Sequence, residues 1–185
     1  TINGTNIISV SCIEPHIHSL KDIFQDLRIK AEETPKGNWV RAWGFSESLV
    51  KENRCPTKEE LDEISTDHPI VVIRTCNHTS IVNSLALEKA GITQGTKDPE
   101  GGIIERNMDG SLTGKLIENA HMNLFEYASY SKEELRKGMK LASDEFIKKG
   151  ITSIHDAGAY GEGSETIRIM QQAINANEIK VRVYA

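Results

Sequence analysis

The segment from Pro69 to Gly91 constrains the fold more than any other part of the sequence. It opens with four consecutive β-branched residues, Ile70 to Ile73, and such a short, continuously apolar run is typical of a strand buried on both faces. Polar residues follow, and then the helix formers LALEKA, which end at a glycine suited to close a helix. Ligand sites in α/β proteins tend to lie where strands end. His78 and Asn83 are therefore candidate site residues.

Composition excludes several classes of function. The 185 residues include 22 Lys and Arg against 27 Asp and Glu, for a net charge of −5, and 38% are hydrophobic. This suits one or two soluble domains with a core, and the absence of a long basic run argues against nucleic acid or membrane surfaces as partners. The three cysteines, Cys12, Cys55 and Cys76, form no CxxC pair, so we expect neither a zinc knuckle nor a disulfide framework. A cytoplasmic location is the expectation.

The remaining chain alternates predicted strands and helices. NIISV (6–10) and WVRAWGF (39–45) predict strands, and Asp109-Gly110 predicts the turn of a β-hairpin. Three capping boxes predict helix starts, at Ser19, Thr57 and Ser131.

The order of these elements predicts three regions. From Ser131 onward the order is helix, strand, helix, strand, ending in IKVRVYA, which is the rhythm of a parallel sheet or barrel. The middle mixes strands, a hairpin and short helices. We therefore expect a barrel-derived strand and helix in 1–38, an inserted small α/β subdomain in 39–118, and βα units in 119–185.

Four segments together resemble the amidohydrolase superfamily, in its family 3 branch. They cover most of the chain from Pro35 to Gly158 and occur in the family's order: PKGNWVRAWGFSE, CPTKEELDEISTDHPIVVIRTCNHTSIVNSLALEKAGI, PEGGIIERNMDGSLTGKLIENA and KKGITSIHDAG. The resemblance implies an α/β fold, part of a (β/α)8 barrel of which this chain holds a few βα units around the insertion. It also implies hydrolysis of C–N bonds in amides, formamides or cyclic ureides with one or two divalent metals, zinc being expected first.

In such enzymes an H-x-H pair closes the first barrel strand, and a lysine, two histidines and an aspartate follow on later strands. The chain contains His16-Ile17-His18, but Glu14-Pro15 precedes it and a capped helix follows it, and the family's pair lies further upstream of NWVRAWGF. We therefore assign it no catalytic or metal-binding role. The chain is expected to be an internal piece that supplies no catalytic residue and no metal ligand of its own.

Four residues remain as candidate substrate contacts. His78 is expected to bind a polar substrate group, the alternative being a histidine that satisfies backbone groups at a turn. Asn83 could reach a ligand, although N-capping of the following helix is favoured. His155 and Asp156 end a barrel-type strand, and they could line a pocket or stiffen the loop by bonding to each other.

The sequence therefore predicts a part of a metal-dependent amidohydrolase that forms the walls of a pocket for a small amide. The alternative is a non-catalytic α/β module that binds a ligand or a partner. Because a piece of a barrel would expose sheet edges, self-association through NIISV and IKVRVYA is also expected.

Overall fold

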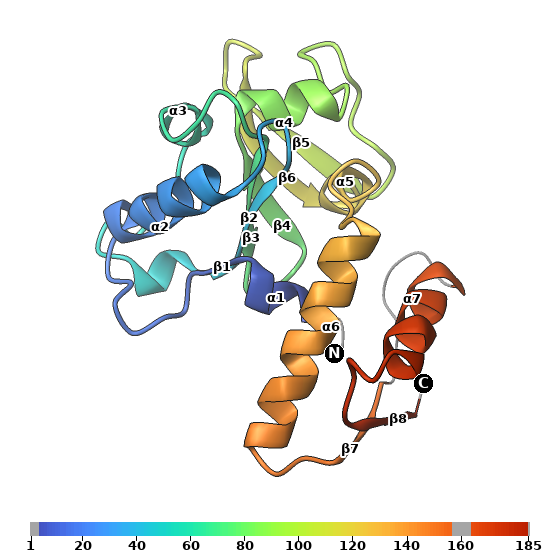
Figure 1. Cartoon of the computed structure of the whole chain (residues 1–185). Coiled ribbons are helices and arrows are strands. Elements are labelled where there is room, and N and C mark those ends of the chain that lie inside the picture. The colour runs from blue at the N-terminus through green and yellow to red at the C-terminus, as the bar shows by residue number, and fades with distance from the viewer. Residues whose placement is uncertain (1–3, 157–163, 185) are drawn as a thin grey trace. The chain divides into compact units, whose positions relative to one another are not determined.

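The computed structural model describes residues 4–156 and 164–184, which fall into two compact units. The larger unit is Ser9–Ser129, and the smaller one combines residues 4–8 with the described residues from Tyr130 onward (Figure 1). Every helix within these residues is too short or too polar to cross a membrane. The α/β class predicted from the sequence is confirmed.

A mixed six-stranded sheet organises the larger unit, in the order β1-β2-β3-β4-β6-β5. β1, β2 and β3 are parallel, whereas β4, β6 and β5 continue the sheet in antiparallel pairings. The strands are β1 (Val10–Ser11), β2 (Val40–Phe45), β3 (Ile70–Arg74), β4 (Thr79–Val82), β5 (Gly102–Arg106) and β6 (Leu112–Glu118).

β3 is buried on both faces, as its apolar run predicted. Ile70 and Val72 belong to the hydrophobic cluster on one face of the sheet, and Val71 and Ile73 to the cluster on the other. This division follows from the two-residue period of a strand, which points successive side chains to opposite faces. The continuous apolar run is therefore that of a central strand covered by helices on both faces of the sheet.

Helices cover both faces of the sheet (Figure 1). One face packs against α2 (Leu20–Glu33), which buries Leu20, Ile23 and Leu27, and against Leu61 of α3 (Lys58–Asp62). The other face packs against α4 (Ser84–Lys89) and α5 (Asn119–Leu124). A single 3-10 turn, η1 (Glu47–Leu49), follows β2.

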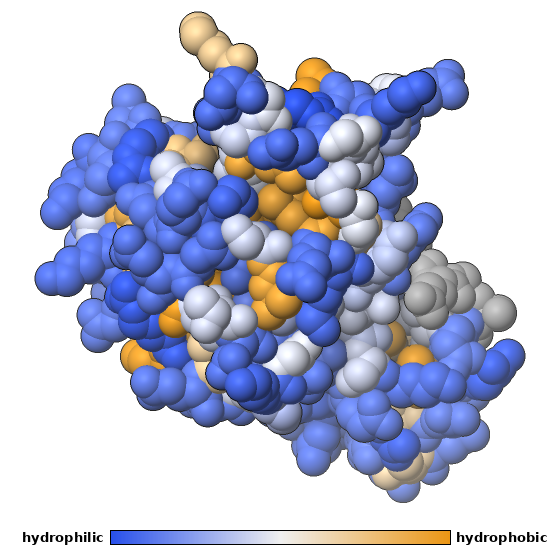
Figure 2. Space-filling view, turned by 90° about the horizontal axis from the view of Figure 1, so that it is seen from above, coloured by the Kyte–Doolittle hydropathy of each residue, from blue (hydrophilic) through white to orange (hydrophobic). Residues whose placement is uncertain are grey.

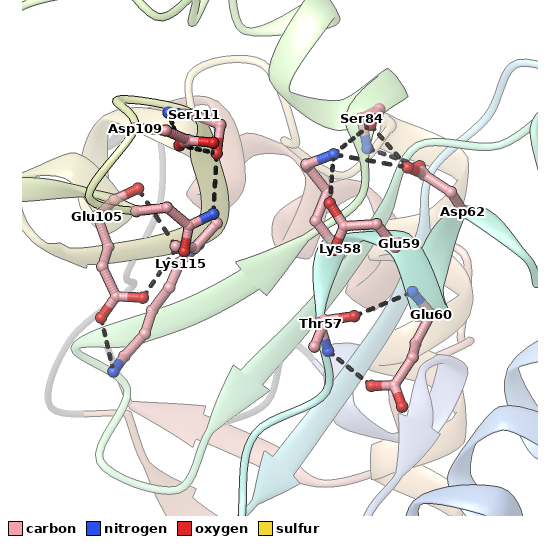
Figure 3. Close-up of polar contacts among 12 residues, drawn as sticks. Thr57, Lys58, Glu59, Glu60, Asp62, Ser84, Glu105, Asp109, Ser111 and Lys115 are labelled. Atoms are coloured by element: carbon pink, nitrogen blue, oxygen red, sulfur yellow. Dashed lines mark hydrogen bonds and ion pairs between the residues drawn. The ribbon is translucent and has the colours of Figure 1, made fainter.

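Local sequence signals set several of these boundaries. Thr57 and Glu60 form the predicted capping box of α3, and the Asp62 carboxylate accepts hydrogen bonds from the backbone and hydroxyl of Ser84, which ties α3 to α4 (Figure 3). In the β5–β6 hairpin the Asp109 carboxylate accepts from the Ser111 backbone N–H at 2.9 Å. The predicted hairpin is thus confirmed.

The smaller unit contains two long helices and a pair of short strands. Its elements are α1 (Thr5–Ile8), α6 (Lys132–Lys148), β7 (Ser153–His155), α7 (Ser164–Asn175) and β8 (Arg182–Tyr184). β7 and β8 are parallel, and Met139 of α6 packs with Ile169 and Met170 of α7 in their shared core. The predicted order of helix, strand, helix, strand is confirmed, including the capping box at Ser131.

Two predictions of secondary structure were wrong. The segment 6–10 was expected to be a strand, but Thr5–Ile8 is helical and packs against α6, where Gly4 lies so close to Gly138 that an added Cβ would be 2.0 Å from its carbonyl oxygen. Tertiary packing here overrides β-propensity. In addition, Thr79–Val82 forms β4, which was not predicted, so that His78 lies in the turn of a hairpin between β3 and β4.

The sheet of the larger unit is open and mixed, and the described residues do not close a barrel. The parallel pair β7 and β8, joined through α7, has the βα pattern expected of barrel units. Its place in a (β/α)8 barrel stays a prediction, as do the domain limits at residues 38 and 118.

Candidate functional site

His78 and Glu118 form a polar pair at one end of the sheet. His78 Nδ1 lies 2.9 Å from Glu118 Oε2, and the Glu118 backbone N–H donates to the His78 carbonyl oxygen at 2.8 Å. The pairing of β4 with β6, with Thr79 opposite Ile117, brings the residue before β4 beside the last residue of β6. The side chains are 63% and 56% exposed, so the pair is accessible to a ligand.

The backbone around this pair adopts unusual conformations. Asn77, directly before His78, has φ 59°, and Glu118 has φ 51° with ψ −122°. Asparagine tolerates the left-handed region, but a glutamate there is strained. Strain of this kind costs roughly 1–3 kcal/mol and concentrates at functional sites. The strained Glu118 is therefore the strongest local indication that this end of the sheet has a function.

Another histidine, His121 of α5, is buried near the pair. His121 is fully buried, its ring meets Phe125 edge-on at 4.9 Å, and neither ring nitrogen hydrogen-bonds within the described residues. Burial lowers the pKa of His121, so the ring stays neutral at physiological pH. His121 therefore does not compete with His78 for the negative charge of Glu118.

Asn83 is the N-cap of α4. Its Oδ1 accepts from the backbone N–H groups of Ala86 (3.0 Å) and Ile70 (2.9 Å), and its Nδ2 donates to the carbonyl oxygens of His68 and Ser65. The side chain is fully buried. The capping alternative is confirmed, and the four hydrogen bonds of the Asn83 side chain all join it to backbone groups. Its role as a substrate contact stays untested.

His155 and Asp156 belong to the smaller unit, at the end of β7. The His155 ring stacks on Tyr184 of β8, with ring centroids 5.0 Å apart and an interplanar angle of 18°. The Asp156 backbone N–H donates to the Tyr184 carbonyl oxygen at 2.8 Å, and Asp156 is buried. The residues that follow, 157–163, lie outside the described part of the chain. The pocket-lining role predicted for these two residues therefore stays a prediction.

The H-x-H segment lies in a turn before α2. His16 Nε2 is 2.8 Å from Asp26 Oδ2, and the His18 backbone N–H donates to the Asp22 carboxylate. Ile17 between them is buried. The two histidines thus have different partners and do not share one strand face as a chelating pair would.

A metal centre does not fit the residues described. No three side chains of His, Cys, Asp or Glu in residues 4–156 and 164–184 are grouped so that they could hold a metal ion. The His78–Glu118 pair offers two donor groups, but they are bonded to each other, and a catalytic zinc takes three protein ligands.

Two cavities elsewhere in the larger unit do not include the pair. One, of about 250 Å³, has a lining that includes the apolar residues Ile92, Ile104 and Leu124. Separately, Figure 2 shows hydrophobic residues in the middle of the face it presents. The other, of about 510 Å³, is polar, but its charged residues pair within the protein, as Glu105 does with Lys115 at 3.2 Å (Figure 3). Both cavities are therefore weaker candidate sites for a polar ligand than the exposed His78–Glu118 pair is.

Sequence reasoning missed Glu118. The residue is 40 positions from His78, and only the antiparallel pairing of the unpredicted β4 with β6 joins them. One signal was available, because Glu118 is a polar residue at the junction of the predicted hairpin and the following helix.

The chain belongs to the amidohydrolase family, whose family 3 description matches residues 6–185. It is 32% identical over 166 residues to an N-substituted formamide deformylase from Arthrobacter pascens, covering 86% of this chain and 30% of that protein. It is 29% identical over 169 residues to the putative amidohydrolase YtcJ of Bacillus subtilis (strain 168), covering 90% and 32%. The chain thus spans about a third of the length of these relatives.

The fold of this chain is similar to part of two solved hydrolase structures. An uncharacterized metal-dependent hydrolase from Pyrococcus horikoshii superposes with a TM-score of 0.67 at 18% identity, over 100% of this chain and 34% of that one. A second, from Pyrococcus furiosus, gives 0.68 at 17% identity, over 99% and 34%. The open sheet and its helices therefore correspond to one part of such a hydrolase.

Proposed function

We propose that this chain is part of a metal-dependent amidohydrolase that cleaves non-peptide C–N bonds, N-substituted formamides among them. The observation that carries the proposal is the His78–Glu118 pair, an accessible polar group on strained backbone in a chain of this family. The similarity to an N-substituted formamide deformylase supports the choice of bond.

In this proposal the chain forms part of the substrate pocket. His78 contacts a polar group of the substrate, and Glu118 fixes the imidazole. The divalent metal, zinc being the first expectation, would be held by residues outside those described and would supply Lewis-acid chemistry there. His155 and Asp156, in the smaller unit, stay candidate substrate contacts.

The test is an assay of the enzyme that contains this chain. Purified protein is stripped with a chelator, reloaded with zinc, and offered N-substituted formamides, simple amides and, as a control, a dipeptide. The proposal predicts hydrolysis of formamides or amides that is lost on chelation and restored by metal. Metal-loaded protein that binds such amides without cleaving them would overturn it in favour of a ligand-binding module.

A further inference from the structure

We infer that His78 selects amides that carry an N–H group, because its Nε2 accepts a hydrogen bond from the substrate nitrogen while Glu118 holds the proton on Nδ1. This inference rests on the proposed function and adds the substrate class: secondary amides are preferred to tertiary ones.

The proton on His78 is placed by its partner. An ionised carboxylate only accepts hydrogen bonds, so the 2.9 Å contact between Glu118 Oε2 and His78 Nδ1 needs the hydrogen on Nδ1. In a neutral imidazole with Nδ1–H, the other nitrogen is an acceptor. No described residue hydrogen-bonds to Nε2, and the side chain is 63% exposed. His78 thus presents a lone pair to a ligand.

The orientation of this lone pair is fixed before a ligand arrives. Glu118 bonds both the ring and the backbone carbonyl of His78, and the positive φ angles of Asn77 and Glu118 set the path of the chain on both sides. A ligand therefore meets a preorganised acceptor and loses less affinity to the ordering of side chains.

Other nearby groups leave the pair intact. His121 is buried and its pKa is lowered by that burial, so it is not a cation that would draw Glu118 away. Arg74, at the end of β3, is bound to Glu47, with Nη2 2.7 Å from Oε2. The carboxylate of Glu118 therefore remains with His78.

An acceptor at this position distinguishes amides by their nitrogen. A secondary amide, such as a formamide with one substituent, offers an N–H to Nε2. A tertiary amide offers only its carbonyl oxygen, which is also an acceptor, and the two lone pairs repel. A site built to hydrogen-bond one substrate group rejects an analogue that lacks it, here by about tenfold or more.

The chain contains a matched control for the position of the proton. In the exposed His16–Asp26 pair the carboxylate contacts Nε2 at 2.8 Å, so His16 carries its hydrogen on Nε2. In His78 the hydrogen is on Nδ1 instead. The two histidines should therefore show opposite neutral tautomers in the same sample.

Nitrogen-15 NMR of the imidazole rings tests whether the hydrogen of His78 is on Nδ1. In spectra recorded under alkaline conditions we expect Nδ1–H for His78 and Nε2–H for His16, with signals assigned through His78→Gln and His16→Gln. Glu118→Gly, which suits the positive φ, should release His78 from the Nδ1–H form and leave His16 unchanged. Nε2–H at His78 in the unaltered protein would overturn the inference.

The preference for secondary over tertiary amides is tested with a pair of substrates. N-benzylformamide and N-benzyl-N-methylformamide are compared by kcat/KM in the metal-loaded enzyme that contains this chain. We expect His78→Leu to reduce the preference for the secondary formamide about tenfold, and His16→Leu to leave it unchanged. Activity with the same preference in His78→Leu overturns the inference alone, whereas cleavage of neither formamide by the unaltered enzyme means that the proposed function itself fails.

Discussion

Glu118 contacts His78 twice, with its carboxylate on Nδ1 at 2.9 Å and with its backbone N–H on the carbonyl oxygen at 2.8 Å. The first contact orients the ring, and the second fixes the turn that carries it. Because β4 and β6 are adjacent only in the folded sheet, this relationship depends on the whole larger unit.

Substitutions at Glu118 should separate backbone strain from the hydrogen bond to His78. Glu118→Ala and Glu118→Gly both remove the carboxylate, but only glycine adopts φ 51° without strain. We expect the glycine variant to be more stable than the alanine variant by about 1 kcal/mol. Urea unfolding of the two proteins gives the difference directly, and equal midpoints would show that the backbone there is relaxed.

Removal of the Asn83 side chain should destabilise the fold. Its amide satisfies two backbone N–H groups and two carbonyl oxygens in the protein interior. We expect Asn83→Ala to lose about 2–4 kcal/mol of the free energy of unfolding, from the lost cap and the unpaired groups. Asn123→Ala, at an exposed position of α5, is the control, with a change within about 0.5 kcal/mol. Equal losses in both variants would contradict this account of Asn83.

The sequence predicted those features that depend on neighbours in the chain. The capping boxes at Thr57 and Ser131, the hairpin at Asp109-Gly110 and the glycine that closes α4 all act over a few residues, and all were found where expected. The β-branched run of β3 was recognised because burial on both faces leaves every position apolar.

Features that depend on distant contacts were not predicted. Thr79–Val82 was merged with the turn and the helix around it, because two polar and two apolar residues give no clear period. Without β4, the pairing that brings Glu118 to His78 could not be foreseen. His121 is another example, since its burial depends on the packing of α5 and not on its neighbours in the sequence.

Acid should weaken the start of α3. The hydrogen bond from Arg54, against some burial, holds the pKa of Glu60 below its ordinary value of 4.5. A lowered pKa in the folded state means that the stabilisation is complete above about pH 4.5 and is lost as the pH falls through the folded-state value. Glu60→Gln and Arg54→Met should both flatten the dependence of stability on pH in this range. An unchanged slope in both variants would show that this carboxylate is not linked to folding.

The three thiols should differ in reactivity. Burial, with the nearby Asp26 charge, raises the pKa of Cys12 to about 12, and burial with the Glu47 carboxylate raises that of Cys55 to about 12. Cys76 is exposed. Because the thiolate is the reactive form, iodoacetamide at about pH 8 should modify Cys76 first, as read by mass spectrometry of the native protein. Rapid labelling that persists in Cys76→Ser would contradict this order.

The most direct test of the central claim is the kcat/KM of the metal-loaded enzyme for a secondary formamide, compared between His78→Leu and His16→Leu. Both variants remove a histidine that is paired with a carboxylate, but only His78 belongs to the proposed substrate site. We predict a loss of about tenfold or more for His78→Leu with unchanged metal content, and no loss for His16→Leu. Full activity in His78→Leu would contradict the claim that this residue contacts the substrate.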